Sequence, residues 1–300
     1  MSRDHLPLAI LLRLSSVLAF AVMNVGIKLA EAWGARLAEI LFWRQAGAAL
    51  LVAGIVAGGP GFAAVRTERI GAHIGRTALG LTAMTLTFTT LTLLPLAEAT
   101  TLGFSMPIFA TVLGALVLRE PTGWWRWGAV LAGFAGVVIV ARPGSGAGIL
   151  PLGIATGLAA ALGTATVSIL LRTLGRTERP LTTVFWFSVL SLVPLGALYA
   201  VAAQGHPPAV WAVLVGLGLL GGLGQLAMTT SLTLGPVSSV VPMDYSALLW
   251  ATLLGWWVFG RWPAETTWIG APVIVASGLV IVWREQARRR VETRQAVPEE

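Results

Sequence analysis

Two charged residues fall well inside long apolar runs of this chain. Asp244 lies about eight residues into the run Val237–Phe259, and Arg44 lies about ten residues into the run Gly34–Ala57. An ionised side chain at the centre of a hydrocarbon layer costs at least ~2.5–3.5 kcal/mol, so each one needs a compensating interaction. Either both face a water-filled cavity and bind the charged groups of a small solute or a proton, or they pair with neighbours and fix helix packing.

Other polar residues of the apolar runs allow the same two interpretations. Lys28 is the single lysine and Asn24 the single asparagine of the chain, and both lie in its first run. Arg13, Lys28, Glu39 and Glu98 lie near the ends of their runs, where long side chains can extend to the water interface. In the alternative interpretation, Glu39 and Glu98 lie at the outer opening of a cavity and control the exit of the solute.

Hydroxyl groups form a stripe in the third run. Thr82, Thr85 and Thr89 follow a spacing of three and four residues, which places them on one face of a helix. Thr92 continues the same face. Such a stripe suits a cavity wall, although a threonine can also bond the carbonyl of its own preceding turn. Thr164 and Ser168 repeat the pattern, and Gln225 adds a side-chain amide to the cavity wall. In the alternative interpretation, such polar side chains form hydrogen bonds between helices, each of which stabilises the packing by ~0.6 kcal/mol.

Aromatic residues and prolines complete the candidates. Most of the 13 tryptophans lie near the ends of runs, as in an interfacial aromatic belt. Trp250 lies deeper and follows Asp244 and Tyr245, so it either lines the same cavity or packs against it. Pro107 and Pro242 interrupt apolar runs and are candidate bending points. The predicted cavity-lining residues are Asn24, Lys28, Arg44, Thr82, Thr85, Thr89, Glu98, Thr164, Ser168, Gln225, Asp244, Tyr245 and Trp250.

Composition sets the class of protein. The 300 residues are 56% hydrophobic and 11% charged, with a mean hydropathy of +0.81, whereas a soluble domain carries about 25% charged residues. We therefore predict an all-α polytopic membrane protein. No cysteine is present, so thiolate metal sites are excluded, and we predict no metal and no cofactor. Basic residues lie at helix ends and in the C-terminal tail, which does not favour nucleic acid as a partner.

Ten runs are long enough to cross a ~30 Å hydrocarbon core at 1.5 Å per residue. They lie near Leu6–Leu29, Gly34–Ala57, Ile74–Leu94, Leu96–Leu118, Trp124–Ala141, Gly153–Thr173, Thr182–Ala203, Val210–Leu234, Val237–Phe259 and Thr267–Arg284.

The sequence contains a duplication. The segment Ala110–Gly114 recurs as Ala251–Gly255, at an offset of 141 residues, and Gly128 and Gly136 recur as Gly270 and Gly278. We predict a first unit at 1–145, a second at 146–285 and a disordered charged tail at 286–300. Because five spans per unit is an odd number, the second unit must be inverted in the membrane, and such repeats commonly enclose a central cavity.

Basic residues predict the orientation. Fourteen of the 20 Lys and Arg residues, Arg76 among them, fall in segments on the same side as the N-terminus, and four fall on the opposite side. Because positive charge accumulates in cytoplasmic segments, we place both termini inside a bacterial-type inner membrane.

Several of these features together resemble the EamA-type drug/metabolite transporter superfamily. They are a proline-interrupted helix ending in Arg119-Glu120, the segment Pro242–Ala251, Asn24 with Lys28, and Arg44. Within it the chain is similar to bacterial amino-acid and metabolite exporters, including the aromatic amino-acid exporter. The resemblance implies that helices one to four and six to nine surround a cavity. Gly260-Arg261 departs from the Gly-Glu common in the family, so the role of that carboxylate does not transfer.

The resemblance implies a secondary transporter that exports small metabolites by alternating access. The expected substrates are amino acids, with aromatic or apolar ones favoured. The other expected partners are the lipid bilayer and a coupling proton. The oligomeric state stays open. A drug or nucleotide-sugar-like substrate is the alternative. An intramembrane enzyme or a structural protein is the alternative from another class; the missing cysteine and the three histidines near helix ends argue against an enzyme.

The orientation can be tested with single cysteines, because the chain has no background thiol. A cysteine at Ala147 should react with a membrane-impermeant maleimide added outside intact cells, and one at Thr177 should not. The reverse labelling pattern would contradict the predicted topology.

Overall fold

The structure is a computed structural model that describes residues 6–116, 124–141, 150–174, 177–234 and 241–295, and these form helices and connecting turns only. The Arg119-Glu120 elbow and most of the loop before Pro151 lie outside the described residues. The elements are α1 (Leu6–Ala32), α2 (Leu37–Gly58), η2 (Phe62–Val65), α3 (Ile70–Leu93), α4 (Leu96–Gly103), α5 (Met106–Leu116), α6 (Trp124–Ala141), α7 (Pro151–Leu174), α8 (Pro180–Ala202), α9 (Pro208–Leu234), η3 (Val241–Tyr245), α11 (Ser246–Phe259) and α12 (Glu265–Gln295).

Seven helical stretches in the described part are long and apolar enough to cross a membrane. They are α1, α2, α4 with α5 taken together, and most of α7, α8, α9 and α12; α6 adds a shorter apolar helix. The 24-residue α3 is not among them, and it carries His73, Arg76 and several threonines. The prediction of an all-helical membrane protein is confirmed; ten crossings in inverted halves stay a prediction.

Three boundaries differ from the sequence-based ones. The fourth predicted span is broken at Phe104 and Ser105 into α4 and α5. The third begins at Ile70 and not at Ile74, so Arg76 lies well within the helix and not at its start. Helix α12 continues to Gln295, beyond the predicted end of the tenth span at Arg284, because the charged segment extends the apolar helix without a break.

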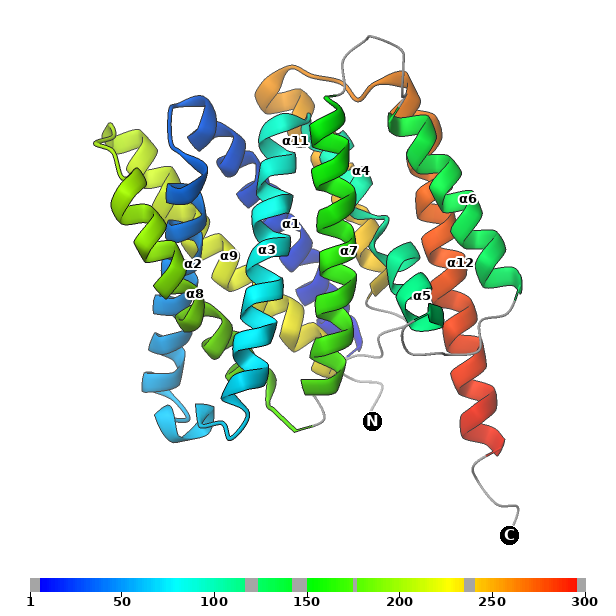
Figure 1. Cartoon of the computed structure of the whole chain (residues 1–300), viewed down its shortest axis with the longest axis horizontal. Coiled ribbons are helices and arrows are strands. Elements are labelled where there is room, and N and C mark those ends of the chain that lie inside the picture. The colour runs from blue at the N-terminus through cyan, green and yellow to red at the C-terminus, as the bar shows by residue number, and fades with distance from the viewer. Residues whose placement is uncertain (1–5, 117–123, 142–149, 175–176, 235–240, 296–300) are drawn as a thin grey trace.

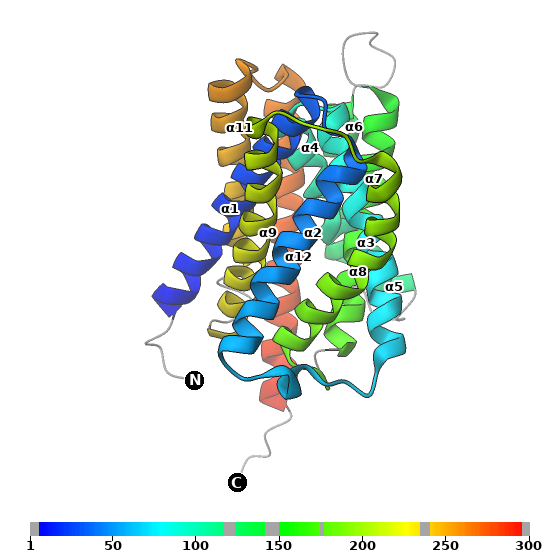
Figure 2. The ribbon, with the colours of Figure 1, turned by 90° about the vertical axis from the view of Figure 1, so that its left-hand side faces the viewer.

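Helices from the two halves of the chain pack against each other in pairs. Helix α1 lies along α9, α3 along α7, α2 along α8, and α6 along α12. Figure 1 shows the α6–α12 pair at one edge of the bundle and α2 with α8 at the other. Figure 2 shows that α1 begins on the same side on which α12 ends.

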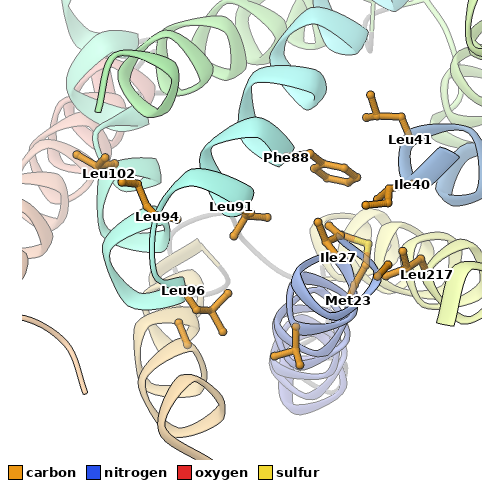
Figure 3. Packing of buried hydrophobic residues seen from close by; sticks show 14 of the residues in the cluster. Met23, Ile27, Ile40, Leu41, Phe88, Leu91, Leu94, Leu96, Leu102 and Leu217 are labelled. Atoms are coloured by element: carbon orange, nitrogen blue, oxygen red, sulfur yellow. The ribbon is translucent and has the colours of Figure 1, made fainter. Parts of the chain in front are cut away.

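The buried apolar core joins α1, α2, α3, α4 and α9. Figure 3 shows side chains of these helices converging, among them Met23, Ile27, Ile40, Leu41, Phe88, Leu91, Leu96 and Leu217. Because lipid is as apolar as leucine, packing between helices and not hydrophobic burial must hold such a bundle together.

Glycines let two helix pairs approach closely. A Cβ atom built on Gly47 of α2 would lie 2.5 Å from the Cα atom of Gly218 on α9. A Cβ atom on Gly270 of α12 would lie 2.7 Å from the carbonyl oxygen of Gly136 on α6. Small residues at these crossings are therefore required by the backbone approach.

We expect Gly47→Ala to destabilise the protein, because the added methyl group meets backbone that no side-chain rotation can move. The cost should be about 1–3 kcal/mol, the usual range for overpacking, and should lower the melting temperature in detergent micelles. Gly54→Ala on the same helix is the matched control. Its Cβ atom would meet nothing within 4 Å, so removing a helical glycine should stabilise by about 0.5–1 kcal/mol. Equal melting temperatures for the two variants would contradict the close approach.

Candidate functional site

Two adjoining cavities lie along α1. The Asp244 cavity, about 270 Å³, is lined by residues of α1, α4, α9, η3 and α11 that include Arg13, Asn24, Phe104 and Asp244. The Lys28 cavity, about 320 Å³, lies toward the other end of α1 and is lined by residues that include Lys28, Glu98 and Arg261. Leu96 and Ala251 line both cavities. Together the cavities form what we term the α1 groove.

An ion pair between the two halves of the chain marks the Asp244 cavity. The Arg13 guanidinium donates from Nε and Nη2 to the two carboxylate oxygens of Asp244. The Arg13 side chain is 8% exposed and that of Asp244 is 38% exposed. This two-point geometry is the strongest that an arginine and a carboxylate form. Asp244 therefore has a partner, and Arg13 does not extend to the interface as expected from the sequence.

The rest of the Asp244 cavity combines aromatic and polar walls. Phe20, Asn24, Thr100 and Phe104 line it. The ring of Tyr245 lies behind Phe104, with ring centroids 5.1 Å apart, and its hydroxyl group reaches the position of Gly278 on α12. The predicted residues Asn24, Asp244 and Tyr245 are thus brought together here.

Lys28 and Glu98 bind backbone groups at the second cavity. The ammonium group of Lys28 donates to the carbonyl oxygens of Leu91 and Leu94, the latter at 2.8 Å. The Glu98 carboxylate accepts from the backbone N–H of Ala264 at 2.9 Å and from the Thr267 hydroxyl group at 3.3 Å. Its second oxygen has no hydrogen-bond partner among the described residues. Lys28 and Glu98, both predicted to line a cavity, therefore line the same one.

Glu39 is fully buried, with none of its surface exposed. Its carboxylate accepts from the backbone N–H groups of Arg36 at 2.8 Å and Gln204 at 3.0 Å, and contacts the His206 ring at 2.9 Å. The idea that Glu39 and Glu98 extend to the interface is wrong, because both carboxylates find backbone donors from other helix ends inside the protein.

Most of the hydroxyl stripe does not line the groove, although Thr92 at its end lines the Lys28 cavity. Thr82, Thr85 and Thr89 each donate to the carbonyl oxygen four residues earlier, at 2.9 Å, and Thr164 and Ser168 do the same at 2.8 Å. None of the five lines either cavity. Their hydroxyl groups are satisfied within their own helices, which was the alternative interpretation.

The remaining predicted residues lie apart from the groove. Arg44 is buried between helices and donates to the side chain of Gln45, so it does not share a cavity with Asp244. Gln225 and Trp250 are half-buried and line neither cavity. Pro107 is the second residue of α5, directly after the break, and Pro242 lies in η3 before α11.

Sequence reasoning missed two arginines of this region. Arg13 was near the beginning of a run, and its pairing with Asp244 spans 231 positions, which no local pattern reveals. Arg76 lay near the start of the predicted third span and was counted only among the basic residues on the side of the N-terminus. The signal for its burial was the helical spacing of His73, Arg76, Thr77 and Gly80, which share one face of α3.

The sequence profile of the EamA-like transporter family matches residues 7–142 and 151–283. The chain belongs to the EamA-like transporter family. It is 31% identical over 234 residues, 75% of this chain and 76% of the relative, to the riboflavin transporter of Vibrio cholerae. It is 26% identical over 228 residues, 74% and 75% of the two chains, to an S-adenosylmethionine uptake transporter of Rickettsia felis. It is 25% identical over 285 residues, 93% and 97%, to a pseudopaline exporter of Pseudomonas aeruginosa.

Membership of the EamA-like family confirms two predictions. This is a multi-pass membrane protein of a bacterial-type transporter family for small metabolites, and it is not an enzyme, because the family and these relatives are named as transporters. A solved crystal structure shares the fold at a TM-score of 0.62 and 21% identity, over 91% of this chain and 94% of that one.

The Arg13–Asp244 pair can be tested with a double-mutant cycle. Arg13→Gln and Asp244→Asn should each lower the melting temperature in detergent, because each leaves a partner charge without its counter-charge. The double variant should lose less than the two losses added together, with a coupling of at least ~1 kcal/mol. Arg66→Gln, at an exposed arginine of the α2–α3 connection, should instead be additive with Asp244→Asn. Additivity in both cycles would contradict the ion pair.

Proposed function

We propose that the α1 groove is the path of a small metabolite that carries both an aromatic ring system and polar or charged groups. The observation that carries this proposal is the juxtaposition of the aromatic walls, Phe20 and Phe104, with the Arg13–Asp244 pair in one cavity. Ring faces bind planar ring systems in offset or edge-on contacts, and the ion pair with Asn24 offers donors and acceptors at the rim.

A flavin-like compound is the first candidate substrate. Its planar heterocycle matches the aromatic walls, and two relatives at 31% and 32% identity, each aligned over about three quarters of this chain, are named as riboflavin transporters. An aromatic amino acid is the second candidate, since a cation and an anion side by side match the carboxylate and ammonium groups of an amino acid. In that case the substrate would separate Arg13 from Asp244.

Alternating access between inverted halves is the proposed mechanism. The pairs of packed helices support it. If each helix is replaced by its counterpart in the other half, the α1–α9 pair becomes the α7–α3 pair, and the α2–α8 and α6–α12 pairs stay the same. Phe104 and Tyr245, equivalent at the offset of 141, touch each other as residues near a two-fold axis would. Leu96 and Ala251, both buried, line both cavities, so a solute that moves from one cavity to the other would pass these two side chains. The break before Pro107 and the change from a 3-10 turn to an α-helix after Pro242 would let α5 and α11 bend.

With both termini inside, the Asp244 cavity lies toward the cytoplasm and the Lys28 cavity toward the outside. Helix α1 carries Arg13 near its beginning and Lys28 near its end, so a solute moving along the groove would meet the ion pair at one end. It would meet Lys28, Glu98 and Arg261 at the other end. Export is the proposed direction, supported by the exporter among the relatives, whereas another relative is named an uptake transporter. The inner bacterial membrane is the proposed location.

Transport should be measured in proteoliposomes loaded separately with labelled riboflavin, S-adenosylmethionine and tryptophan, with and without a pH gradient. Asp244→Asn should lower the rate for the transported compound more than tenfold, which corresponds to at least ~1.4 kcal/mol. Thr82→Val is the matched control and should stay within twofold, because Thr82 is exposed and its hydroxyl group bonds its own helix.

The amount of folded protein in the vesicles is checked by size-exclusion chromatography before each assay. Full transport by a folded Asp244→Asn variant would refute the role of the groove. Preference for tryptophan over riboflavin would favour the amino-acid candidate, and a rate dependent on the imposed pH gradient would identify a proton as the coupling ion.

A further inference from the structure

A second cluster of buried charge lies away from the α1 groove. Arg44 of α2 is 8% exposed and Arg76 of α3 is 6% exposed, and neither lines the two cavities. Gln45 and Phe187 connect them: Arg44 donates to the Gln45 side chain, which donates to the Phe187 carbonyl oxygen, and Arg76 lies over the Phe187 ring. Buried arginines normally pair with carboxylates, because an uncompensated buried charge costs several kcal/mol.

The cluster is built where α2, α3 and α8 meet. The Arg76 guanidinium lies 3.6 Å above the centre of the Phe187 ring on α8. The Gln45 side-chain amide donates to the carbonyl oxygen of the same Phe187 at 3.4 Å, and its oxygen accepts from Arg44. Arg44 Nε also lies 3.2 Å from the Cβ position of Gly221 on α9. Four helices therefore fix these two arginines in place.

Several donors of the cluster point at no acceptor. Arg44 Nε, Arg76 Nε and Arg76 Nη1 have no hydrogen-bond partner among the described residues, and the same holds for the buried Thr77 hydroxyl group. Thr77 follows Arg76 on α3 and is 4% exposed. A guanidinium group that keeps free donors after burial is suited to accept a further ligand.

No carboxylate of the described residues pairs with either arginine. The ion pairs in this part of the chain are Arg13–Asp244, His206–Glu39 and His73–Glu178. Glu178 lies at the margin of the cluster, with its carboxylate 3.8 Å from His73 Nε2 and accepting from the Thr67 hydroxyl group at 2.6 Å. The two arginines are thus left with positive charge and with donors in excess.

We propose that Arg44 and Arg76 form an oxyanion-binding site that takes a carboxylate or phosphate group. The guanidinium fork matches the two oxygens of either group, and a bound anion supplies the counter-charge that the helices do not. The Thr77 hydroxyl group is a third donor on the same face of α3 as Arg76. The site is separate from the groove, so the proposal does not rest on the transported substrate proposed above.

Helices α2, α3 and α8 enclose the cluster, so an anion reaches Arg76 when the Phe187 side chain turns away from the guanidinium group. Phe187 is then the side chain that covers it, since this residue contacts both Arg76 and Gln45. The same chemistry can come from a free inorganic anion or from the acidic group of a larger solute, and the experiment separates these sources.

The site is tested by binding, without any transport assay. The purified full-length protein in nanodiscs of zwitterionic phosphatidylcholine is titrated with inorganic phosphate, with acetate and with chloride at matched ionic strength. Melting temperature is recorded at each concentration. For the wild type we expect a saturable rise with phosphate or acetate and none with chloride. Phosphate alone would identify a phosphate site, and acetate alone a carboxylate site.

Arg44→Met and Arg76→Met keep most of the side-chain stem and remove the charge. Each should raise the half-saturating concentration at least tenfold, and each should melt no lower than the wild type without anion, because an uncompensated buried charge has been removed. Arg66→Met, at an exposed arginine, is the matched control and should leave the titration unchanged.

Two results would overturn the proposal. One is a wild type whose response to phosphate and to acetate equals its response to chloride, which would make the cluster a packing feature alone. The other is a folded Met variant that keeps the wild-type titration. If a Met variant does not fold, Arg44→Lys and Arg76→Lys replace it, since they keep the charge but lose the fork, and unchanged half-saturation in both would likewise refute the site. Failure of transport by the groove would leave these outcomes unaffected.

Discussion

The need to satisfy carboxylates inside an apolar helical bundle is the constraint on which this structure depends. Asp244 of the second half binds Arg13 of the first. Glu39 of the first half binds the backbone of Gln204 and the ring of His206 in the second. Glu98 of the first half binds the backbone of Ala264 in the second. Because low polarity makes each unpaired group expensive, every one of these acids joins the two halves of the chain.

Contacts between loops join one side of the bundle at both ends. The α2–α3 connection meets the start of α8, where Thr67 donates to Glu178 at 2.6 Å and Arg69 to Thr177 at 2.9 Å. At the other end, the α1–α2 connection meets the α8–α9 connection through Glu39. The α1 groove lies away from these contacts, against α4 and α11. The helices most suited to move are therefore the short, interrupted ones that line the groove.

Two charge arrangements coexist in the bundle and differ in chemistry. In the groove a cation and an anion neutralise each other, and the Asp244 carboxylate remains partly exposed, so a solute can compete with Arg13 for it. In the Arg44–Arg76 cluster two cations are buried together beside an aromatic ring and an amide. The first arrangement suits a solute that carries both signs of charge, and the second suits an anion.

The sequence by itself determined the class of protein, the family and most helix boundaries. Hydropathy and chain length act locally, which is why α6 was predicted at its observed residues, Trp124–Ala141. The sequence also predicted Asp244, Lys28 and Glu98 as residues of the candidate site. Burying a charged side chain is costly whichever residue becomes its partner, so the charge alone marks the position. The partners were set by the tertiary structure alone: packing and rotation of whole helices decide that Asp244 meets Arg13 across 231 positions. The Thr82 and Thr85 hydroxyl groups bond their own helix, and the same packing of helices places Arg76 over the ring of Phe187 on α8.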